Sequence, residues 1–593
     1  MKYAGTEARH DSATSNSRRS TVWTTLGIGL IVFSIYVLSG PGRIDIIDGQ
    51  LRYEVSANLV QNGRPELRDK FITSNAMLAV RGKDGAFYSF YCIAGSVFAA
   101  PFVWLGGLLG SPEGEGQRFL FSLSSGLFGA LAACVLYIFY IDLGVSKKRA
   151  LMWCFVSAFA TLLWPTSTST FDNAQHSFFS LFAIYLGYRS AIKKSIGLSI
   201  IAGVVAGILI NYQEYFVLLI PALALSCLTW QGRKIDDDDA GKSSATKSRT
   251  KSSGLDFNDV ARGIGSVVSA IRKLAFGDGE YAMARRRYLA YACGAWSGAV
   301  VFFFYNYMRF GSIFNSGKFD IIAQGHPVFF GSFFIGLPGL LVSPGKSIFL
   351  YSPPIILGLI GIRRLWRVAP QVGLSVATTS FVLLMFLSKI SFFGGDWCWG
   401  PRYLVILLPL WALAFPFLPK GNIVRVLAIT IVVIGFAVQV MALSVDHYRF
   451  FLENDLPGHF WADEPGFYMR KSALFARAGE MMSLSQGVPR SALQFTQTPY
   501  EGTLTYCIFG VRPINGLRLS QWIKQYQVFY LPRPWPLWMR EIDPEQRPIN
   551  LEAWVIAMML MLGIGVYATG RGLRIGEKQK IPAFIESPAS AVP

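Results

Sequence analysis

Long apolar stretches separated by short polar segments run through most of the chain. A membrane-spanning helix needs about 20 mostly apolar residues. Thirteen stretches approach or reach that length, at residues 22–38, 88–109, 118–141, 150–164, 177–192, 196–210, 215–230, 289–307, 346–362, 371–387, 403–418, 423–443 and 551–569. The pattern therefore predicts an all-α polytopic membrane protein.

The positions of the basic residues indicate which stretches cross the membrane. Cytoplasmic loops are rich in Lys and Arg, yet thirteen crossings would place the clusters 147–149 and 193–194 outside. The stretch 88–109 contains Pro101 and three glycines, and the loop after it carries only acidic charge. We therefore predict that 88–109 lies in the outer interface. This leaves about twelve spans, with both termini cytoplasmic.

Composition and charge support this interpretation. Of 593 residues, 52% are hydrophobic and 15% charged, whereas a soluble chain has roughly 25% charged residues. The net charge of +19 would favour nucleic acid in a soluble protein. Here the basic clusters fall in predicted inside loops, so no nucleic acid is expected. Seven cysteines without a Cys-x-x-Cys pair favour neither a zinc site nor a disulfide framework.

The same pattern divides the chain into regions. The polar start runs into an apolar stretch without a small-residue cleavage site, which is typical of an uncleaved signal anchor. The predicted regions are a cytoplasmic tail (1–21), a transmembrane domain (22–445) with a first external loop (41–117), a mobile cytoplasmic loop (231–287) and a second external loop (309–345), a small external cap (446–550), a last transmembrane helix (551–570) and a cytoplasmic tail (571–593).

Acidic residues gather in the predicted external loops. Asp45 and Asp48 follow the first span, and apolar residues between 51 and 67 recur at helical spacing. This predicts an amphipathic helix on the membrane surface with Asp48 at its start, where an N-cap role is the structural alternative. Asp172 lies in the next external loop, one helical turn before His176. Two carboxylates facing one cavity could serve as a general base and its partner, or hold Mg²⁺ or Mn²⁺.

Basic residues on the same side require an explanation, because they depart from the usual distribution of charge. A bound phosphate is one explanation, since fixed guanidinium and ammonium groups hold phosphates. Ion pairing with the external carboxylates is the other. The residues concerned are Arg43, Arg52, Arg309, Lys318, Lys346, Lys389 and Arg402.

Four short motifs follow one another in order. Phe87-Tyr88-Ser89-Phe90-Tyr91 leads into the stretch with Pro101, and later come 306–312 (Asn-Tyr-Met-Arg-Phe-Gly-Ser), 341–346 (Leu-Val-Ser-Pro-Gly-Lys) and 399–403 (Trp-Gly-Pro-Arg-Tyr). With the acidic residues of the first two external loops, this order resembles the GT-C membrane glycosyltransferases. The most similar branch contains the protein O-mannosyltransferases and the lipid A aminoarabinose transferase. The resemblance covers roughly residues 22–445.

The resemblance implies a GT-C-like transmembrane helical bundle and an enzyme that moves a sugar from a polyprenyl phosphate carrier to an acceptor on the outer face of the membrane. Asp48 matches the family's catalytic base and Asp172 its second acidic position, while Asp45 is a rival for the base. Gly49 follows Asp48 where the family often has Glu, and Gln213 stands where a Lys is sometimes found. Substrate or donor-phosphate contacts are predicted for Arg43, Arg52, Tyr53, His176, Glu214, Arg309, Lys346 and Arg402.

The predicted reaction is an inverting displacement. Asp48 or Asp45 takes the proton of the acceptor hydroxyl, while cations stabilise the departing lipid phosphate. The sequence contains no P-loop and no Gly-rich dinucleotide motif after a strand. The expected partners are the lipid-linked donor, a lipid, glycan or protein acceptor, and membrane lipids, in a bacterial inner membrane with the active site outside. A transporter or flippase of lipid-linked sugars and a non-catalytic scaffold are the alternative interpretations.

Overall fold

The computed structural model describes residues 4–42, 44–68, 79–109, 115–229, 278–318, 331–395, 398–444, 450, 464–484 and 550–578. The fold in these ranges is helical apart from one short hairpin, which confirms the predicted all-α polytopic class. The first elements are α1 (Ala4–Ser39), α2 (Ile47–Asn62), β1 (Ala79–Arg81), β2 (Phe87–Ser89), α4 (Ala94–Gly107), α5 (Glu115–Ser122), α6 (Ser124–Asp142), α7 (Lys147–Phe159), α8 (Leu163–Thr168), α9 (Asn173–Lys193), α10 (Ile196–Ile210), η2 (Glu214–Leu219), α11 (Ile220–Ala224) and η3 (Leu225–Cys227). The later elements are α13 (Glu280–Phe310), α15 (Phe333–Val342), α16 (Ile348–Tyr351), α17 (Ile355–Val368), α18 (Pro370–Leu387), η5 (Arg402–Leu407), α19 (Leu408–Ala412), η6 (Phe415–Phe417), α20 (Asn422–Ser444), α22 (Glu464–Arg470), α23 (Ala473–Leu484) and α26 (Leu551–Lys578).

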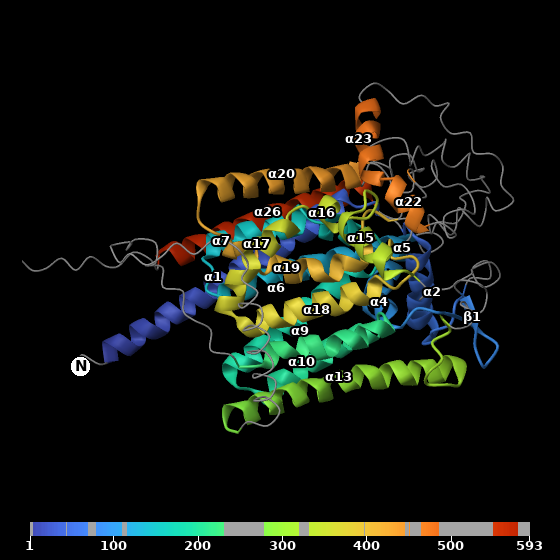
Figure 1. The fold of residues 1–593 in the computed structure, drawn as a ribbon, viewed down its shortest axis with the longest axis horizontal. Coiled ribbons are helices and arrows are strands. Elements are labelled where there is room, and N and C mark those ends of the chain that lie inside the picture. Colours follow the sequence, from blue (N-terminus) through green and yellow to red (C-terminus); the bar gives the residue numbers. More distant parts are fainter. Residues whose placement is uncertain are drawn as a thin grey trace, which may run out of the picture.

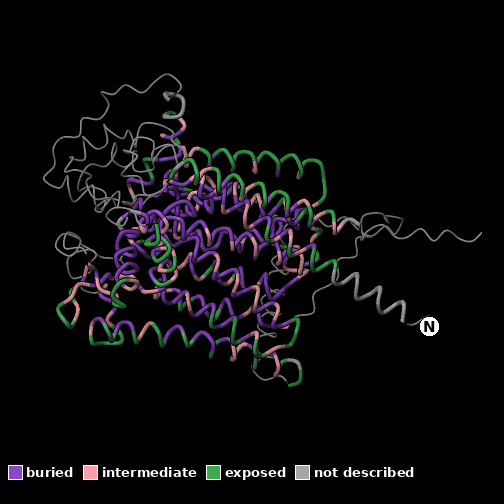
Figure 2. The backbone as a smooth tube through the Cα atoms, turned by 180° about the vertical axis from the view of Figure 1, so that it is seen from behind, coloured by how far each residue is buried: buried purple, intermediate pink, exposed green. Residues whose placement is uncertain are grey.

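Most of the long helices run side by side in a bundle (Figure 1). Buried residues fill its interior, whereas α13 and α20 on the outside expose apolar side chains such as Val300 and Ile429 (Figure 2). Within the described residues, six helices are long and apolar enough to cross a membrane, at Asn16–Ser39, Gly116–Asp142, Tyr281–Phe310, Pro370–Leu387, Asn422–Ser444 and Glu552–Gly576. Five shorter apolar helices accompany them. An apolar outer surface of this extent suits lipid rather than water.

Several predicted spans are interrupted rather than continuous, and two of them break into three short helical segments each. The stretch 215–230 contains η2, α11 and η3, and the stretch 403–418 contains η5, α19 and η6. Pro221, Pro409 and Pro416 each stand at the first or second position of a helical segment there. Proline lacks a backbone N–H and clashes with the preceding turn, so it begins a helix readily but does not continue one. The apolar pattern predicts where these segments lie, and the prolines explain their interruption.

The predicted interfacial stretch 88–109 divides into a strand and a helix. β2 pairs antiparallel with β1, with Val80 opposite Tyr88, and α4 follows with Pro101 inside it. Neither strand is visible in the sequence pattern, because each is only three residues long. The position of α4 in the membrane interface stays a prediction.

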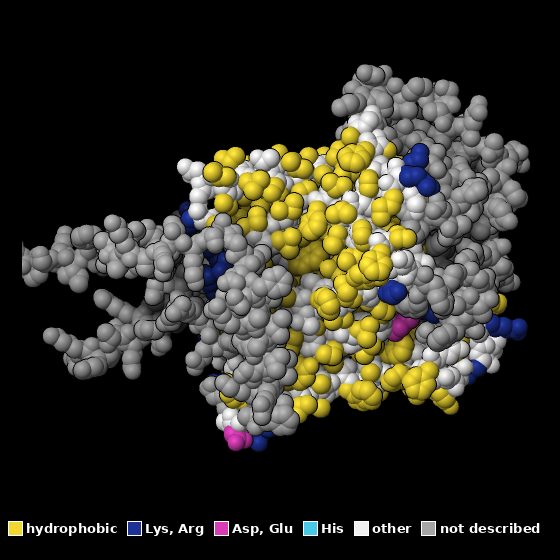
Figure 3. All heavy atoms as spheres, viewed as in Figure 1, with side chains coloured by type: hydrophobic (Ala, Val, Ile, Leu, Met, Phe, Trp, Pro, Cys, Tyr) yellow, Lys and Arg dark blue, Asp and Glu magenta, His cyan; other side chains and the backbone are white. Residues whose placement is uncertain are grey.

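Charged side chains are concentrated toward the ends of the bundle, with an apolar band between them (Figure 3). At one end Lys147 donates to Ser20 Oγ at 2.7 Å, and Arg287 donates to the Cys227 carbonyl at 3.1 Å. α2 stands across the opposite end, near β1, α4 and α5 (Figure 1). The basic clusters that predict the inside loops are therefore separated from the acidic residues on and around α2.

α2 is buried on all sides through Asn58. Leu51 and Val55 belong to an apolar cluster, and the charged Arg52 and Glu54 are also buried. The spacing of apolar residues correctly predicts a helix here, and its position at the membrane surface stays a prediction. Neighbouring elements enclose the polar face that the pattern assigned to water.

Candidate active site

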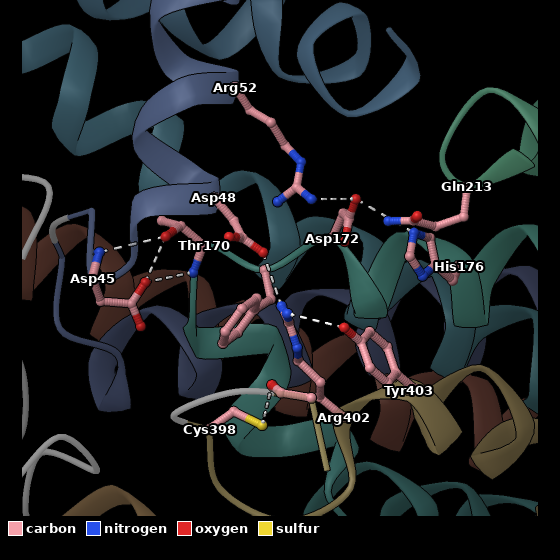
Figure 4. Close-up of polar contacts among 12 residues, drawn as sticks. Asp45, Asp48, Arg52, Thr170, Asp172, His176, Gln213, Cys398, Arg402 and Tyr403 are labelled. Atoms are coloured by element: carbon pink, nitrogen blue, oxygen red, sulfur yellow. Dashed lines mark hydrogen bonds and ion pairs between the residues drawn. The ribbon is translucent and has the colours of Figure 1, made fainter. Parts of the chain in front are cut away.

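Asp48 and Arg402 form a buried ion pair. Asp48 lies in the first turn of α2, where the helix dipole favours a carboxylate, and the N-cap is Ile46 rather than Asp48. Arg402 begins η5 and donates through Nη1 to Asp48 Oδ2 at 3.0 Å (Figure 4). The two side chains are 7% and 4% exposed for Arg402 and Asp48. This contact joins the start of α2 to the start of η5, two segments that are far apart in the sequence.

A second ion pair lies beside the first. Arg52, one helical turn after Asp48, places Nη2 2.9 Å from Asp172 Oδ2, and His176 Nε2 is 3.5 Å from the same oxygen (Figure 4). Asp172 occupies the N-cap position of α9 but makes no capping hydrogen bond with its side chain. Its carboxylate is therefore available to Arg52. The structure thus brings together five predicted residues, namely Asp48, Arg52, Asp172, His176 and Arg402.

Asp45 has a different environment. Its carboxylate accepts hydrogen bonds from the Thr170 backbone N–H at 2.8 Å and from Thr170 Oγ1 at 2.5 Å. Thr170 stands two residues before Asp172, so this contact fixes the Asp172 loop against the start of α2. Asp45 is thus engaged in joining the two loops, whereas Asp48 is paired with Arg402. Which of the two carboxylates acts as the base stays a prediction.

Asp45→Asn is expected to lower the free energy of unfolding by about 1–3 kcal/mol, because a buried acceptor of two hydrogen bonds is altered. In a Thr170→Val background the same change should cost much less, since the two residues share one interaction. Thermal unfolding of the wild type, both single variants and the double variant measures this coupling. If the losses of unfolding free energy in the two single variants simply added in the double variant, Asp45 and Thr170 would not share an interaction.

Glycines make room for the side chains of Thr170, Arg52 and Arg402. A Cβ at Gly49 would collide with the side chain of Thr170, and a Cβ at Gly95 would lie 3.0 Å from Arg52 Cδ. Gly395 has a φ of +75°, and a Cβ there would also lie 2.8 Å from Arg402 Cγ. The departure from the family pattern at Gly49 thus has a steric reason, because α2 approaches Thr170 too closely for a side chain.

The charge state of Asp172 follows from its neighbours. Burial by itself would raise the pKa of the Asp172 carboxyl, yet the Arg52 guanidinium and then His176 hold that pKa well below its usual range. A depressed pKa in the folded state means that the ionised carboxylate contributes stability above the unfolded pKa, about 3.9. That contribution is lost as the pH falls through the folded pKa.

Asp172→Asn should therefore destabilise the protein by about 3–5 kcal/mol at neutral pH, because it leaves the buried Arg52 charge without its partner. The difference between variant and wild type should stay constant down to about pH 5 and shrink below about pH 4, where the unfolded carboxyl begins to bind protons. Thermal unfolding in detergent across this pH range measures it. A difference that widens toward acid would show that the pair does not stabilise the ionised carboxylate.

Arg309 and Lys346 hold backbone groups. Arg309 Nη1 donates to the Ser89 carbonyl at 2.6 Å. Lys346 Nζ donates to the carbonyls of Cys398 and Gly400 at 2.9 and 3.1 Å. Their contact with a donor phosphate stays a prediction, but these bonds give each residue a role in fixing the chain.

The remaining predicted site residues are Glu214, Tyr53 and Arg43. Glu214 pairs with Lys318 at 2.7 Å, and Lys318 also donates to Gln213 Oε1 at 3.3 Å. Lys318, from the segment after α13, therefore places an ammonium group beside Gln213, the position at which the resemblance would allow a Lys. Tyr53 packs in an apolar cluster on another side of α2. Arg43 lies outside the described residues.

The chain is similar to solved structures at low sequence identity. No protein-family description and no curated protein matches the sequence. Among solved structures, the chain is similar to the archaeal oligosaccharyltransferase AglB from Archaeoglobus fulgidus, solved with an inhibitory peptide and a dolichol-phosphate, at 12% identity and a TM-score of 0.39 over 82% of this chain and 64% of AglB. It is also similar to the arabinosyltransferase EmbB from Mycobacterium smegmatis, at 11% identity and a TM-score of 0.35 over 93% of this chain and 42% of EmbB.

The chain covers less than two thirds of the length of either protein.

Tyr91 is a site residue that the sequence did not single out. The Arg52 guanidinium carbon lies 4.5 Å from the centre of the Tyr91 ring. Burial, and after it the charge of Asp48, raises the pKa of the Tyr91 hydroxyl well above its usual value, so the hydroxyl stays protonated beside Asp48. Its place in the motif 87–91 was the available signal, but nothing in that motif indicates the partner.

A second polar cluster occupies the opposite face of α2. Gln50 Nε2 donates to Glu54 Oε1 at 2.9 Å, and Arg118 Nη1 donates to Gln50 Oε1 at 2.7 Å. Arg68 Nε lies 3.2 Å from Glu54 Oε2. Residues two positions apart on a helix point nearly opposite ways, so the alternation of Asp48, Gln50, Arg52 and Glu54 separates two polar clusters.

The predicted divalent cation does not fit these residues. Asp48 and Asp172 are each already engaged by a guanidinium group, at 3.0 and 2.9 Å. In the described part of the chain, no group of three or more His, Cys, Asp or Glu side chains is placed to hold an ion. Mg²⁺ or Mn²⁺ would have to displace an arginine to reach two carboxylate ligands.

Proposed function

We propose that this chain is a membrane glycosyltransferase that moves a sugar from a polyprenyl phosphate carrier to an acceptor hydroxyl. The observation that supports it most is the pair of adjacent buried contacts Asp48–Arg402 and Arg52–Asp172 at one end of the bundle. Arg52 Nη1 is also buried, and it has no hydrogen-bond partner among the described residues. A buried donor without a partner is costly, and a phosphate oxygen of a bound donor would offset that cost.

The proposed reaction assigns each side chain a task. The acceptor oxygen attacks the anomeric carbon as its proton passes to the Asp48 carboxylate. The bond from the anomeric carbon to the phosphate oxygen breaks, its electron pair stays with the phosphate, and attack from the opposite side inverts the configuration. Arg52 and Arg402 stabilise the departing phosphate. Asp172 and His176 keep Arg52 in position.

The separation of charge supports an external site. The start of α7, which contains Lys147, and the first turns of α13, which contain Arg287, lie at the far end of the bundle from α2 (Figure 1). Loops rich in Lys and Arg stay on the cytoplasmic side, so we infer that α2 and the ion pairs face outward. In a bacterial inner membrane this places the reaction on the periplasmic side.

A transfer assay tests the proposal. Purified protein in lipid nanodiscs is incubated with radiolabelled polyprenyl-phosphate sugars and candidate lipid, glycan and peptide acceptors, and the products are separated by chromatography. The expected result is time-dependent loss of the labelled donor with formation of a labelled product. In proteoliposomes, movement of intact donor between leaflets without cleavage of its sugar–phosphate bond would instead identify a transporter.

A further inference from the structure

The loop that delivers Arg402 is held by side chains rather than by regular secondary structure. Cys398 and Trp399 are buried in it, and Cys398 Sγ lies 3.1 and 3.3 Å from the carbonyl oxygens of Gly395 and Gly400, either of which can accept its single S–H. The Arg402 backbone N–H donates to the Gly400 carbonyl at 3.1 Å. The direction in which Arg402 leaves the backbone therefore depends on where these carbonyls are fixed.

Lys346 fixes both ends of this short segment. Its ammonium donates to the Cys398 carbonyl at 2.9 Å and to the Gly400 carbonyl at 3.1 Å, and lies 3.3 Å from Cys398 Sγ. The Lys346 residue is only 1% exposed. Burying an ammonium group is costly unless its hydrogen bonds are made, and here those bonds go to the carbonyls of Cys398 and Gly400, the residues before and after Trp399.

α22 closes the other side of Lys346. The Lys346 ammonium lies 4.5 Å from the centre of the Tyr468 ring, within the range of a cation–π contact. The Gly345 N–H donates to the Tyr468 carbonyl at 3.0 Å. Just after α22, Ser472 Oγ donates to the Pro344 carbonyl at 2.7 Å. Three neighbouring positions, 344 to 346, are thus fixed to the segment that contains α22.

α23 reaches the same loop through Trp399. The Arg477 guanidinium carbon lies 5.5 Å from the Trp399 ring, and Arg477 is fully buried. The Leu474 N–H donates to the Tyr351 hydroxyl at 3.1 Å, and the Tyr351 ring packs edge-on against Trp399 at 5.2 Å. α23 therefore supports the part of the loop that Lys346 holds from the other direction.

We propose that Lys346 is a positioning residue for Arg402. α22 holds Lys346 and the residues before it, and α23 holds Trp399 in the loop that precedes Arg402. Asp48 receives Arg402 on one side of the loop, while Lys346 and the two helices hold the loop on the other. The functional consequence rests on the proposed function, because it is Arg402 that would meet the donor phosphate. The region after residue 444, predicted as an external cap, then contributes to the geometry of the active site itself.

The state of the loop is tested without any substrate. The rate at which N-ethylmaleimide labels Cys398 is measured by mass spectrometry in the full-length protein in detergent. Lys346→Met should raise this rate by about 10–100-fold, since losing buried hydrogen bonds from a charged donor opens the loop. Ser472→Ala removes only one bond of the support and should raise it about 2–5-fold. If Lys346→Met does not fold, Ser472→Ala decides the question.

Arg287→Met is the matched control, because Arg287 is an equally buried cation that donates to the Cys227 carbonyl at the opposite end. It should leave the labelling of Cys398 unchanged even if it lowers the melting temperature. Unchanged labelling in both Lys346→Met and Ser472→Ala, or an equal increase in Arg287→Met, would overturn the proposal.

Binding of undecaprenyl phosphate tests whether Lys346 acts through Arg402. Lys346→Met and Arg402→Met should each weaken binding, and the double variant should bind at most about twofold more weakly than Arg402→Met alone. If the fold-losses of affinity in the two single variants multiplied in the double variant, Lys346 would not act through Arg402. If the wild type does not bind undecaprenyl phosphate, the proposed function fails, whereas the labelling of Cys398 still decides whether Lys346 holds the loop.

Discussion

Asp48→Asn is expected to reduce sugar transfer by about 10²–10⁴-fold, the range that general base catalysis contributes. Asparagine has nearly the same shape, and its amide oxygen still accepts from Arg402, which lies 3.0 Å from Asp48 in the wild type. As with Asp172→Asn, the loss of a carboxylate charge beside a buried guanidinium should lower the free energy of unfolding, so transfer is compared at a temperature where the variant is folded. The substitution removes the group that takes the acceptor proton but keeps the hydrogen bond that positions it. Initial rates with a saturating labelled donor measure the loss, and size-exclusion chromatography with thermal unfolding verifies the fold.

Asp45→Asn is the matched control for this loss. Asp45 is three residues away and equally buried, but its carboxylate is bonded to Thr170. We expect the Asp45 variant to keep most of its transfer rate at temperatures where it is folded. Full transfer by the Asp48 variant would refute its role as the base. Complete loss in a folded Asp45 variant would transfer that role to Asp45.

The sequence predicts which charges share a side of the membrane but not which of them form ion pairs. Asp48 and Asp172 are both predicted in external loops, and the structure places their arginine partners next to one another. The partner of Asp48 is 354 positions away at Arg402. Each arginine in the sequence could equally have paired with a phosphate or with any external carboxylate. Only the packing of η5 against the start of α2 decides between them.

Hydrogen bonds to backbone carbonyls are invisible in a sequence for the same reason. Lys346 and Arg309 stand in motifs whose positive charges predict phosphate contacts, and the structure shows in addition that both donate to backbone carbonyls. A carbonyl is present at every residue, so no residue type indicates that it will accept such a bond. The amphipathic spacing of α2 likewise identifies a helix without indicating that its polar face meets other protein rather than water.

The ion pairs explain how an apolar bundle holds charge for an anionic substrate. Two buried carboxylates and two buried guanidinium groups balance one another at 2.9 and 3.0 Å, which avoids the large cost of an unpaired buried ion. A guanidinium has five donors in a planar fork. Arg52 can therefore remain paired with Asp172 through Nη2 while Nη1 is directed at a ligand.

Arg52→Lys should weaken the binding of polyprenyl phosphate by about 10–100-fold, the equivalent of one or two hydrogen bonds to a charged group. A lysine ammonium can still neutralise Asp172, so the protein should remain folded. It lacks the planar fork that serves the carboxylate and a phosphate at once. Binding of undecaprenyl phosphate to the purified variant, measured by thermophoresis, gives the dissociation constant. A lower transfer rate at subsaturating donor should accompany the weaker binding.

Arg118→Lys provides the matched control on the other side of α2. Arg118 is also a buried arginine next to this helix, but it donates to Gln50 at 2.7 Å in the second polar cluster. Its replacement should change the melting temperature more than the affinity for the lipid phosphate. Wild-type affinity in Arg52→Lys would exclude Nη1 as a phosphate donor. An equal loss of affinity in both variants would indicate that distortion of α2 is the cause. Of the two substituted arginines, Arg52 lies in the cluster of Asp48 and Asp172 and Arg118 does not.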